Sequence, residues 1–155
     1  MESSLKRFTQ DGLFSFLLPS EWSHQAEQNG TQVFWHPQSG SGTLRVSSVT
    51  ANKVVDPSGA PAVQVLSKKS AVSLRQDGVA WTSYRELADR YEEPTVMFWW
   101  ELAQFVPPKY FRIAFFSFTI YAREENEPAT AEAIRLLHQQ LSATEFEFGP
   151  LLEWE

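Results

Sequence analysis

Two neighbouring apolar stretches constrain most strongly what this chain can fold into. Residues 96–105 read VMFWWELAQF, residues 109–122 read KYFRIAFFSFTIYA, and a short segment containing two prolines separates them. Both stretches are rich in the aromatic and β-branched residues that favour strands, and consecutive prolines favour a turn. We therefore predict two long consecutive strands that form an antiparallel hairpin.

Both faces of these two strands are apolar. Successive residues of a strand point to opposite faces. One face therefore carries Val96, Phe98, Trp100 and Leu102, and the other carries Met97, Trp99, Ala103 and Phe105. A strand with one solvated face would alternate between apolar and polar residues instead. We expect both faces to be covered, which predicts an α+β fold: a three-layer α/β/α sandwich with a mainly antiparallel sheet of about six strands.

The rest of the chain supplies further strands and two helices. Strands are predicted over residues 13–18, 43–51 and 79–91, and in the last of these the capping-box spacing of Ser83 and Glu86 leaves a helix as the alternative. Asn29 and Gly30 predict a hairpin with a two-residue loop, which needs positive φ at both residues and pairs Ala26 with Val33. Apolar residues at helical spacing predict helices over residues 61–78 and 126–144, the second with Asn126 as its N-cap.

The segment LFSFLLPSEW, residues 13–22, resembles the start of PsbP-like domains, which open with a strand, a proline and a tryptophan. The order of a central helix, three strands and a final helix ending near LSATEF also resembles that family, over roughly residues 8–148. Its fold is shared by the photosystem II extrinsic protein PsbP, a Ran-binding nuclear import factor and bacterial families of unknown function. The resemblance implies docking to another protein, and it transfers no catalytic residue.

Length and charge narrow the class of protein. The 155 residues suit a single domain over 1–155, with a core over about 8–148 and a C-terminal tail over 149–155. The absence of cysteine excludes disulfides, thiol catalysis and cysteine-type zinc sites. A net charge of −6 with scattered basic residues argues against nucleic acid as a partner. No apolar run is long enough for a membrane span, and the charged start MESSLKRF is unlike a secretory signal, so we expect a cytoplasmic protein.

The sequence contains no recognisable catalytic or metal-binding motif. Its histidines, His24, His36 and His138, lack the close spacing of a helical metal site. The segment GSGTLR, residues 40–45, lacks the third glycine of a dinucleotide loop and precedes a strand instead of a helix. We therefore predict a protein that is not an enzyme and that uses no cofactor or metal.

Glu101 is the one charged residue within the first apolar stretch, and it allows two interpretations. Burial beside Met97 and Trp99 would raise its pKa and suit a general acid or the polar anchor of a ligand pocket lined by Trp81, Trp99 or Trp100. Alternatively, Glu101 is a structural carboxylate paired with a strand neighbour such as Arg112.

Two acidic clusters and the tail are the candidate partner contacts. The clusters DRYEE and REENE would meet at one end of the sheet and could form an acidic docking patch, or they are ordinary solvated loops. The tail could bind a partner or pack on its own domain. The candidate contact residues are Asp89, Glu92, Glu93, Glu101, Glu124, Glu125, Leu151, Leu152 and Trp154.

These observations favour a non-catalytic cytoplasmic protein-binding module, one version of which is a bacterial immunity or secretion-system accessory protein. The alternative is a small apolar-ligand binding protein with a tryptophan-lined pocket. The expected partner is a protein, and the chain itself is expected to be a monomer or a homodimer.

Overall fold

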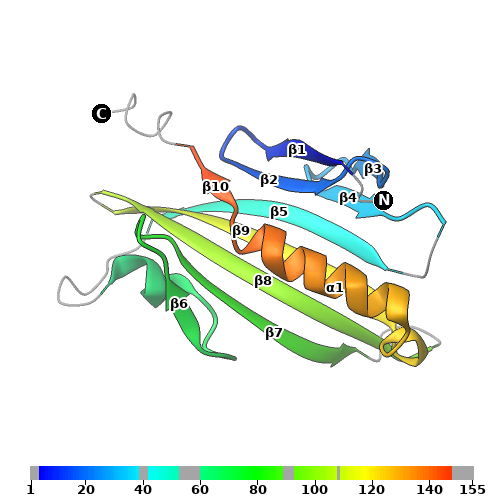
Figure 1. Cartoon of the computed structure of the whole chain (residues 1–155). Helices are drawn as coiled ribbons and strands as arrows, with labels where there is room; N and C mark the ends of the chain where they lie inside the picture. Colours follow the sequence, from blue (N-terminus) through cyan, green and yellow to red (C-terminus); the bar gives the residue numbers. More distant parts are fainter. Residues whose placement is uncertain (1–3, 39–41, 53–59, 89–92, 108, 148–155) are drawn as a thin grey trace.

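The computed structural model describes residues 4–38, 42–52, 60–88, 93–107 and 109–147. Over these residues the architecture is mainly β, with ten strands in two antiparallel sheets and a single α-helix (Figure 1). The larger sheet has seven strands in the order β3 (Ser23–Ala26), β4 (Gln32–Trp35), β5 (Thr43–Asn52), β9 (Tyr110–Tyr121), β8 (Thr95–Val106), β7 (Ala80–Ala88) and β6 (Val72–Leu74). The smaller sheet contains β1 (Leu5–Gln10), β2 (Phe14–Pro19) and β10 (Glu145–Phe146), with β2 in the middle.

The predicted long hairpin is confirmed and forms the centre of the seven-stranded sheet. Strands β8 and β9 pair along their whole length, from Val106 opposite Tyr110 to Thr95 opposite Tyr121. The neighbouring strand β5 pairs with β9 over ten residues, and β7 pairs with β8 over nine. The antiparallel topology that the short connections predicted is therefore correct.

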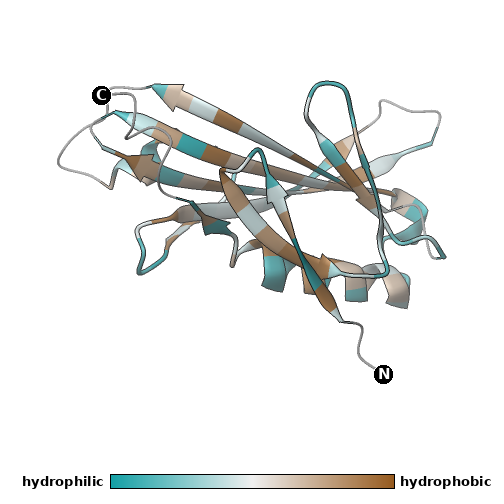
Figure 2. Cartoon of the chain, turned by 90° about the horizontal axis from the view of Figure 1, so that it is seen from above, coloured by the Kyte–Doolittle hydropathy of each residue, from teal (hydrophilic) through white to brown (hydrophobic). Residues whose placement is uncertain are grey.

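One face of this sheet carries the main hydrophobic core. Helix α1 (Pro128–Leu141) and the three-stranded sheet lie side by side over it (Figure 1). Hydrophobic residues follow the strands of both sheets, as Figure 2 shows from above. The largest fully buried side chains of this core are Phe14, Phe16, Leu18, Phe34, Leu44, Trp100, Leu102, Phe116, Ile120 and Leu137.

The opposite face has a smaller cover. The 3-10 helix η1 (Pro61–Val65) and the residues after it place Ala62 and Leu66 on Ala80, Ala103 and Phe111, which form a second, smaller cluster. Only one end of the sheet face is covered in this way, and the described residues include no helix layer on this side. The predicted three-layer α/β/α sandwich is therefore wrong, and so is the count of about six strands.

The error lies in residues 61–78, which were expected to form one helix. Only Pro61–Val65 is helical, and Val72–Leu74 is strand β6, paired with Ala80, Trp81 and Thr82 of β7. Gly78, with a φ of 87°, completes the turn between β6 and β7. Cross-strand pairing with a neighbour outweighs the helical spacing of this segment, which is rich in valine, a residue that loses side-chain freedom in a helix.

Three local expectations also needed correction. The first hairpin pairs Ala26 with Gln32 instead of Val33. The Glu27 N–H donates a hydrogen bond to the Thr31 carbonyl, so the loop is longer than two residues, and only Gly30 in this loop has a positive φ. Strand β2 was predicted, but it belongs to the smaller sheet beside β1, which has mostly exposed residues and was missed. Helix α1 has Glu127 at its N-cap position instead of Asn126.

Candidate functional site

Glu101 has two hydrogen-bond partners within the chain. It lies on the η1 side of β8 and is only 5% exposed. The backbone N–H of Ser67 donates to its Oε1 at 2.8 Å, and the Tyr84 hydroxyl donates to its Oε2. Arg112, the neighbour suggested from the sequence, points to the opposite face of the sheet and cannot be this partner. Glu101 therefore fastens the segment after η1 to the sheet.

Tyr84 connects Glu101 to a short row of aromatic and charged groups. Burial raises the pKa of the Tyr84 phenol above its ordinary value, and the Glu101 carboxylate adds to this effect. The Tyr84 ring stacks on Trp99 with 6.2 Å between centroids, and Lys69 Nζ lies 5.1 Å from the Tyr84 centroid while pairing with Glu86. The phenol stays protonated at neutral pH, so it donates to Glu101 and does not act as a base.

Three described carboxylates of the acidic clusters, Glu93, Glu124 and Glu125, pair with arginines. Arg123 Nε lies 2.5 Å from Glu93 Oε1, and its Nη1 lies 3.4 Å from Glu124 Oε2. Arg85 binds both carboxylate oxygens of Glu125, at 2.6 and 2.7 Å, and these hydrogen bonds lower the pKa of Glu125. This end of the sheet therefore presents a mixed ionic surface.

Other candidate contacts cannot be placed. Asp89, Glu92, Leu151, Leu152 and Trp154 lie outside the described residues.

The tryptophans named as alternative pocket-lining residues, Trp81, Trp99 and Trp100, lie on two faces of the sheet. Trp99 shares the η1 face with Glu101, as their register opposite Ser117 and Phe115 shows. Trp100 belongs to the main core under α1, and Trp81 packs against that core. A single pocket that combines Trp99 and Trp100 side chains with Glu101 as its anchor is therefore not formed.

A groove that sequence reasoning missed runs between α1 and strands β7 and β8. Its volume is about 590 Å³, and we call it the α1 groove. The lining residues include Ser83 and Arg85 of β7, Phe98 and Trp100 of β8, and Ile134 and His138 of α1. Phe98 and Ile134 are only half-buried, so the groove has an apolar floor that the domain itself does not fill.

Polar groups fix the walls of the α1 groove. Trp100 Nε1 donates to His138 Nδ1 at 3.4 Å, a long hydrogen bond that assigns the proton of the neutral imidazole to Nε2. The Arg85–Glu125 pair stands at one side, and Arg135 pairs with Glu132 on α1. The groove is thus an apolar channel with a charged rim, as binding sites commonly are.

The outer edge of β7 runs beside this groove, and no described strand pairs with its residues 83–88. Among the described residues, β6 pairs only with Ala80, Trp81 and Thr82. The bond from Arg75 N to Val79 O shows that the backbone of Val79 faces β6, and strand alternation then directs the backbone groups of Ser83, Arg85 and Leu87 to the same side. The described residues offer these three no backbone hydrogen bond, and we call residues 83–88 the β7 edge. Leu87, at 71%, is the most exposed large hydrophobic residue described.

A second groove, of about 670 Å³, lies on the other side of α1. Trp22, His36, Phe118 and Thr130 are among its lining residues. Leu5, the first residue of the edge strand β1, also lines this groove.

Arg112 is a buried cation without a described partner. Its side chain is fully buried on the α1 face of β9, and its three guanidinium nitrogens make no hydrogen bond within the described residues. Oε1 of Gln104, the residue directly opposite on β8, is also buried and unpartnered there. Burial lowers the pKa of Arg112, and Glu147 is the one acid whose charge opposes that effect.

Metal and membrane features are absent from the described part of the chain. No group of three or more histidine, aspartate or glutamate side chains in these residues could hold a metal ion. No helix there is long and apolar enough to cross a membrane.

Comparison with known proteins gives a fold likeness and no family. No family model and no curated protein sequence matches the chain. A Bacteroides thetaiotaomicron VPI-5482 protein, known from a crystal structure at 1.50 Å resolution, has a TM-score of 0.52 and 20% identity to this chain. The match covers 79% of this chain and 43% of that one, so this chain spans less than half of its length. Such identity shows the fold alone, and the PsbP-like resemblance stays a prediction.

Proposed function

We propose that this domain is a protein-binding module that takes an extended segment of its partner along the β7 edge. The observation that carries the proposal is the edge at Ser83, Arg85 and Leu87, which no described strand pairs with and which lies beside the α1 groove. A strand edge with unpaired backbone groups is a template for another strand. Native proteins commonly protect such an edge by pairing it, covering it or placing charged residues on it. Leu87 is uncharged and exposed, and no described strand pairs with it.

The arrangement supplies both affinity and selectivity. Backbone groups of Ser83, Arg85 and Leu87 would bond the added strand, and each such bond contributes about 0.5–1.5 kcal/mol net. Alternate side chains of the added strand would point to the α1 side, toward Phe98 and Ile134. We therefore expect a partner segment with apolar residues at every second position.

A small apolar ligand in the α1 groove is the second candidate. The half-buried ring of Phe98 and the half-buried side chain of Ile134, which line this groove, favour it. Such a ligand would need the groove and not the backbone of the β7 edge. Replacing Phe98 by alanine would weaken both kinds of binding, whereas a change that affects only the β7 edge would leave the small ligand bound.

A bacterial, cytoplasmic accessory or immunity protein is one version of the protein-binding proposal. The Bacteroides protein of similar fold is compatible with a bacterial origin and says nothing of the partner. Identification of the partner in the native host would distinguish an immunity protein from a secretion-system accessory protein.

Selection from a phage-displayed library of random linear peptides tests the proposal without knowledge of the partner. We expect enriched peptides with alternating apolar residues, whose binding shifts the backbone amide resonances of β7 and the side chains of the α1 groove. Enrichment no greater than on a matrix without the domain, or shifts confined to other strands, would overturn the proposal.

A further inference from the structure

Two hairpin loops of the seven-stranded sheet repeat one hydrogen-bond pattern. The loop between β3 and β4 reads EQNGT, residues 27–31, and the loop between β6 and β7 reads RQDGV, residues 75–79. In both, the first N–H donates to the fifth carbonyl at 2.8 Å, and the glycine N–H donates to the first carbonyl, at 3.1 and 3.0 Å. Gly30 and Gly78 have φ values of 89° and 87°. Both are three-residue hairpin loops that end on a left-handed glycine.

The loops differ at the residue before the glycine, which is Asn29 in the first and Asp77 in the second. Each side chain accepts a hydrogen bond from the backbone two residues on. The Thr31 N–H donates to Asn29 Oδ1 at 3.0 Å, and the Val79 N–H donates to Asp77 Oδ1 at 3.1 Å. Asp77 is also paired with Arg75, which lowers its pKa, whereas Asn29 is an exposed neutral amide. The first loop therefore presents an uncharged carbonyl carbon beside a glycine nitrogen.

We propose that Asn29 deamidates spontaneously in the folded protein. The Gly30 nitrogen attacks the Asn29 side-chain carbonyl carbon, and the bond from that carbon to the amide nitrogen breaks. The amide nitrogen leaves as ammonia with the proton of the Gly30 N–H, and a five-membered succinimide ring remains. Water then opens the ring at one of its two carbonyls. One opening gives aspartate, and the other gives isoaspartate, in which the main chain runs through the former side chain.

The surroundings of Asn29 favour this reaction. Gly30 has no side chain to shield its nitrogen, and both residues are exposed to the water that the second step needs. The hydrogen bond from the Thr31 N–H polarises the carbonyl under attack and stabilises the negative charge that develops on Oδ1. The Gly30 N–H must first leave the Glu27 carbonyl, and a hydrogen bond in an exposed loop opens at low free energy.

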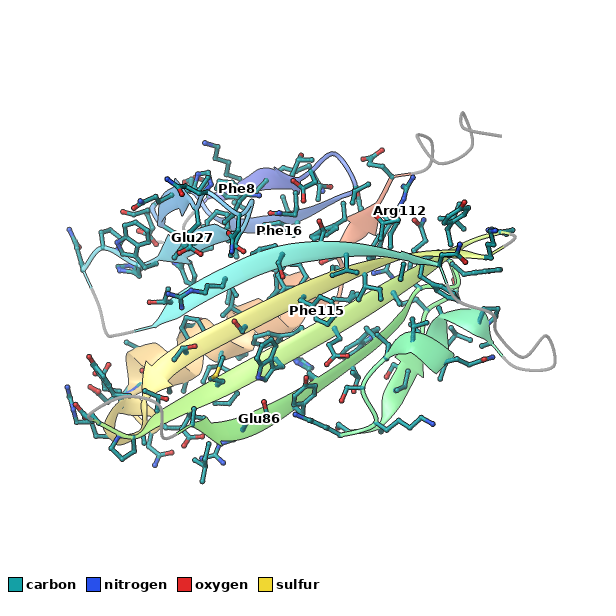
Figure 3. The ribbon with its side chains drawn as sticks, turned by 180° about the vertical axis from the view of Figure 1, so that it is seen from behind. Phe8, Phe16, Glu27, Glu86, Arg112 and Phe115 are labelled. Atoms are coloured by element: carbon teal, nitrogen blue, oxygen red, sulfur yellow. The ribbon has the colours of Figure 1, made fainter. Side chains whose placement is uncertain are left out.

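The two products should affect the fold differently. The Asp77 loop shows that an aspartate fits this geometry, so the aspartate product should keep the hairpin. Isoaspartate adds one carbon to the main chain immediately before Gly30, whose carbonyl accepts a hydrogen bond from Gln10 Nε2 at 2.8 Å. Figure 3 shows Glu27, the first residue of this loop, near Phe8 of the smaller sheet. We expect isoaspartate to loosen the contact between this loop and the smaller sheet.

Peptide mapping by mass spectrometry, during incubation of the folded chain in mildly alkaline buffer, tests the proposal. We expect the peptide with Asn29 to gain the mass difference between an amide and a carboxylic acid, as two products that chromatography separates. Asn126 is also exposed but is followed by Glu127, whose side chain shields the attacking nitrogen, so Asn126 should react more slowly.

Two variants of Asn29 serve as controls. Asn29→Gln keeps an amide but lengthens the side chain by one carbon, so ring closure should slow at least about tenfold. Asn29→Asp supplies the aspartate product as a standard, and the isolated isoaspartate form should unfold at a lower urea concentration than this variant. The reaction needs no peptide at the β7 edge, so its outcome is independent of the proposed function.

The proposal is wrong if the folded chain keeps Asn29 unchanged while the chain unfolded in urea loses it. Equal rates at Asn29 and Asn126, or an equal rate in Asn29→Gln, would overturn it as well. Equal urea midpoints for the two products would contradict the effect assigned to isoaspartate.

Discussion

The Tyr84 hydroxyl donates a hydrogen bond to the Glu101 carboxylate across strands β7 and β8, in a site where burial raises the pKa of the phenol. Because the folded-state pKa is raised, the folded protein holds the phenolic proton more tightly than the unfolded chain does. The resulting stabilisation is complete below pH 10.0, the unperturbed value, and is lost as pH rises toward the folded-state pKa.

This relationship predicts a pH dependence that depends on one residue. The free energy of unfolding should fall as pH rises above about 10, and the fall should be smaller in Tyr84→Phe. At neutral pH, Tyr84→Phe should cost about 1–3 kcal/mol, since one carboxylate oxygen loses its donor in a buried site. Urea unfolding at a series of pH values measures both, and an equal alkaline decline in the two proteins would contradict the account.

Arg112 should limit the stability of the domain. Replacing it with methionine, of similar length, removes a buried charge that lacks a described partner and should raise the free energy of unfolding by about 1–4 kcal/mol. Arg112→Lys keeps the charge and is the matched control, expected to give no gain. A loss of stability in Arg112→Met would show that the guanidinium is satisfied in the folded protein.

Arg75 should hold the β6–β7 turn to the end of α1. Its Nη1 donates to the carbonyls of Ser142 and Thr144, at 3.1 and 2.8 Å, and its other guanidinium nitrogens bind Asp77. Arg75→Met should cost about 1–3 kcal/mol, because two part-buried carbonyls just after the helix lose their donor. Asp77→Asn is the milder comparison, since an exposed ion pair contributes about 0–1 kcal/mol. Equal effects of the two changes on the urea midpoint would contradict this assignment.

Much of the fold follows from sequence patterns that are local. The β8–β9 hairpin was predictable because its apolar stretches are long and a proline-containing turn separates them. The alternation that puts Trp99 and Trp100 on opposite faces follows directly from strand geometry. Helix α1 was predictable from its apolar spacing and from Pro128 in its first turn.

The parts that were wrong depend on contacts between distant segments. Residues 61–78 carry a helical spacing, yet β6 pairs with β7 and η1 packs on the sheet. Apolar residues on both faces of β8 suggested a complete second layer, whereas the described residues cover the sheet face opposite α1 at one end only. A sequence pattern shows which residues avoid water, but it does not show whether their cover belongs to the same chain.

The candidate site shows the same division. The sequence singled out Glu101 and left open whether it has a partner, and the partners are Tyr84 and the Ser67 backbone. No sequence pattern indicated the β7 edge. This edge exists because β6 has three residues, whereas its neighbour β7 has nine. Edge exposure of this kind becomes visible only when strand lengths and pairing are known.

The affinity of a library-selected peptide for Leu87→Pro, compared with Leu87→Thr, tests the central claim most directly. Both changes remove the leucine side chain, but only proline removes the outward N–H, and the pairing of β7 with β8 keeps its hydrogen bonds in both. We predict about two- to tenfold weaker binding to Leu87→Pro than to Leu87→Thr, which corresponds to the loss of one backbone hydrogen bond of about 0.5–1.5 kcal/mol. Amide exchange of Arg85 and Leu87 in the unchanged chain should also slow when the peptide binds. Equal affinities for the two variants, with no such slowing, would contradict strand addition at the β7 edge.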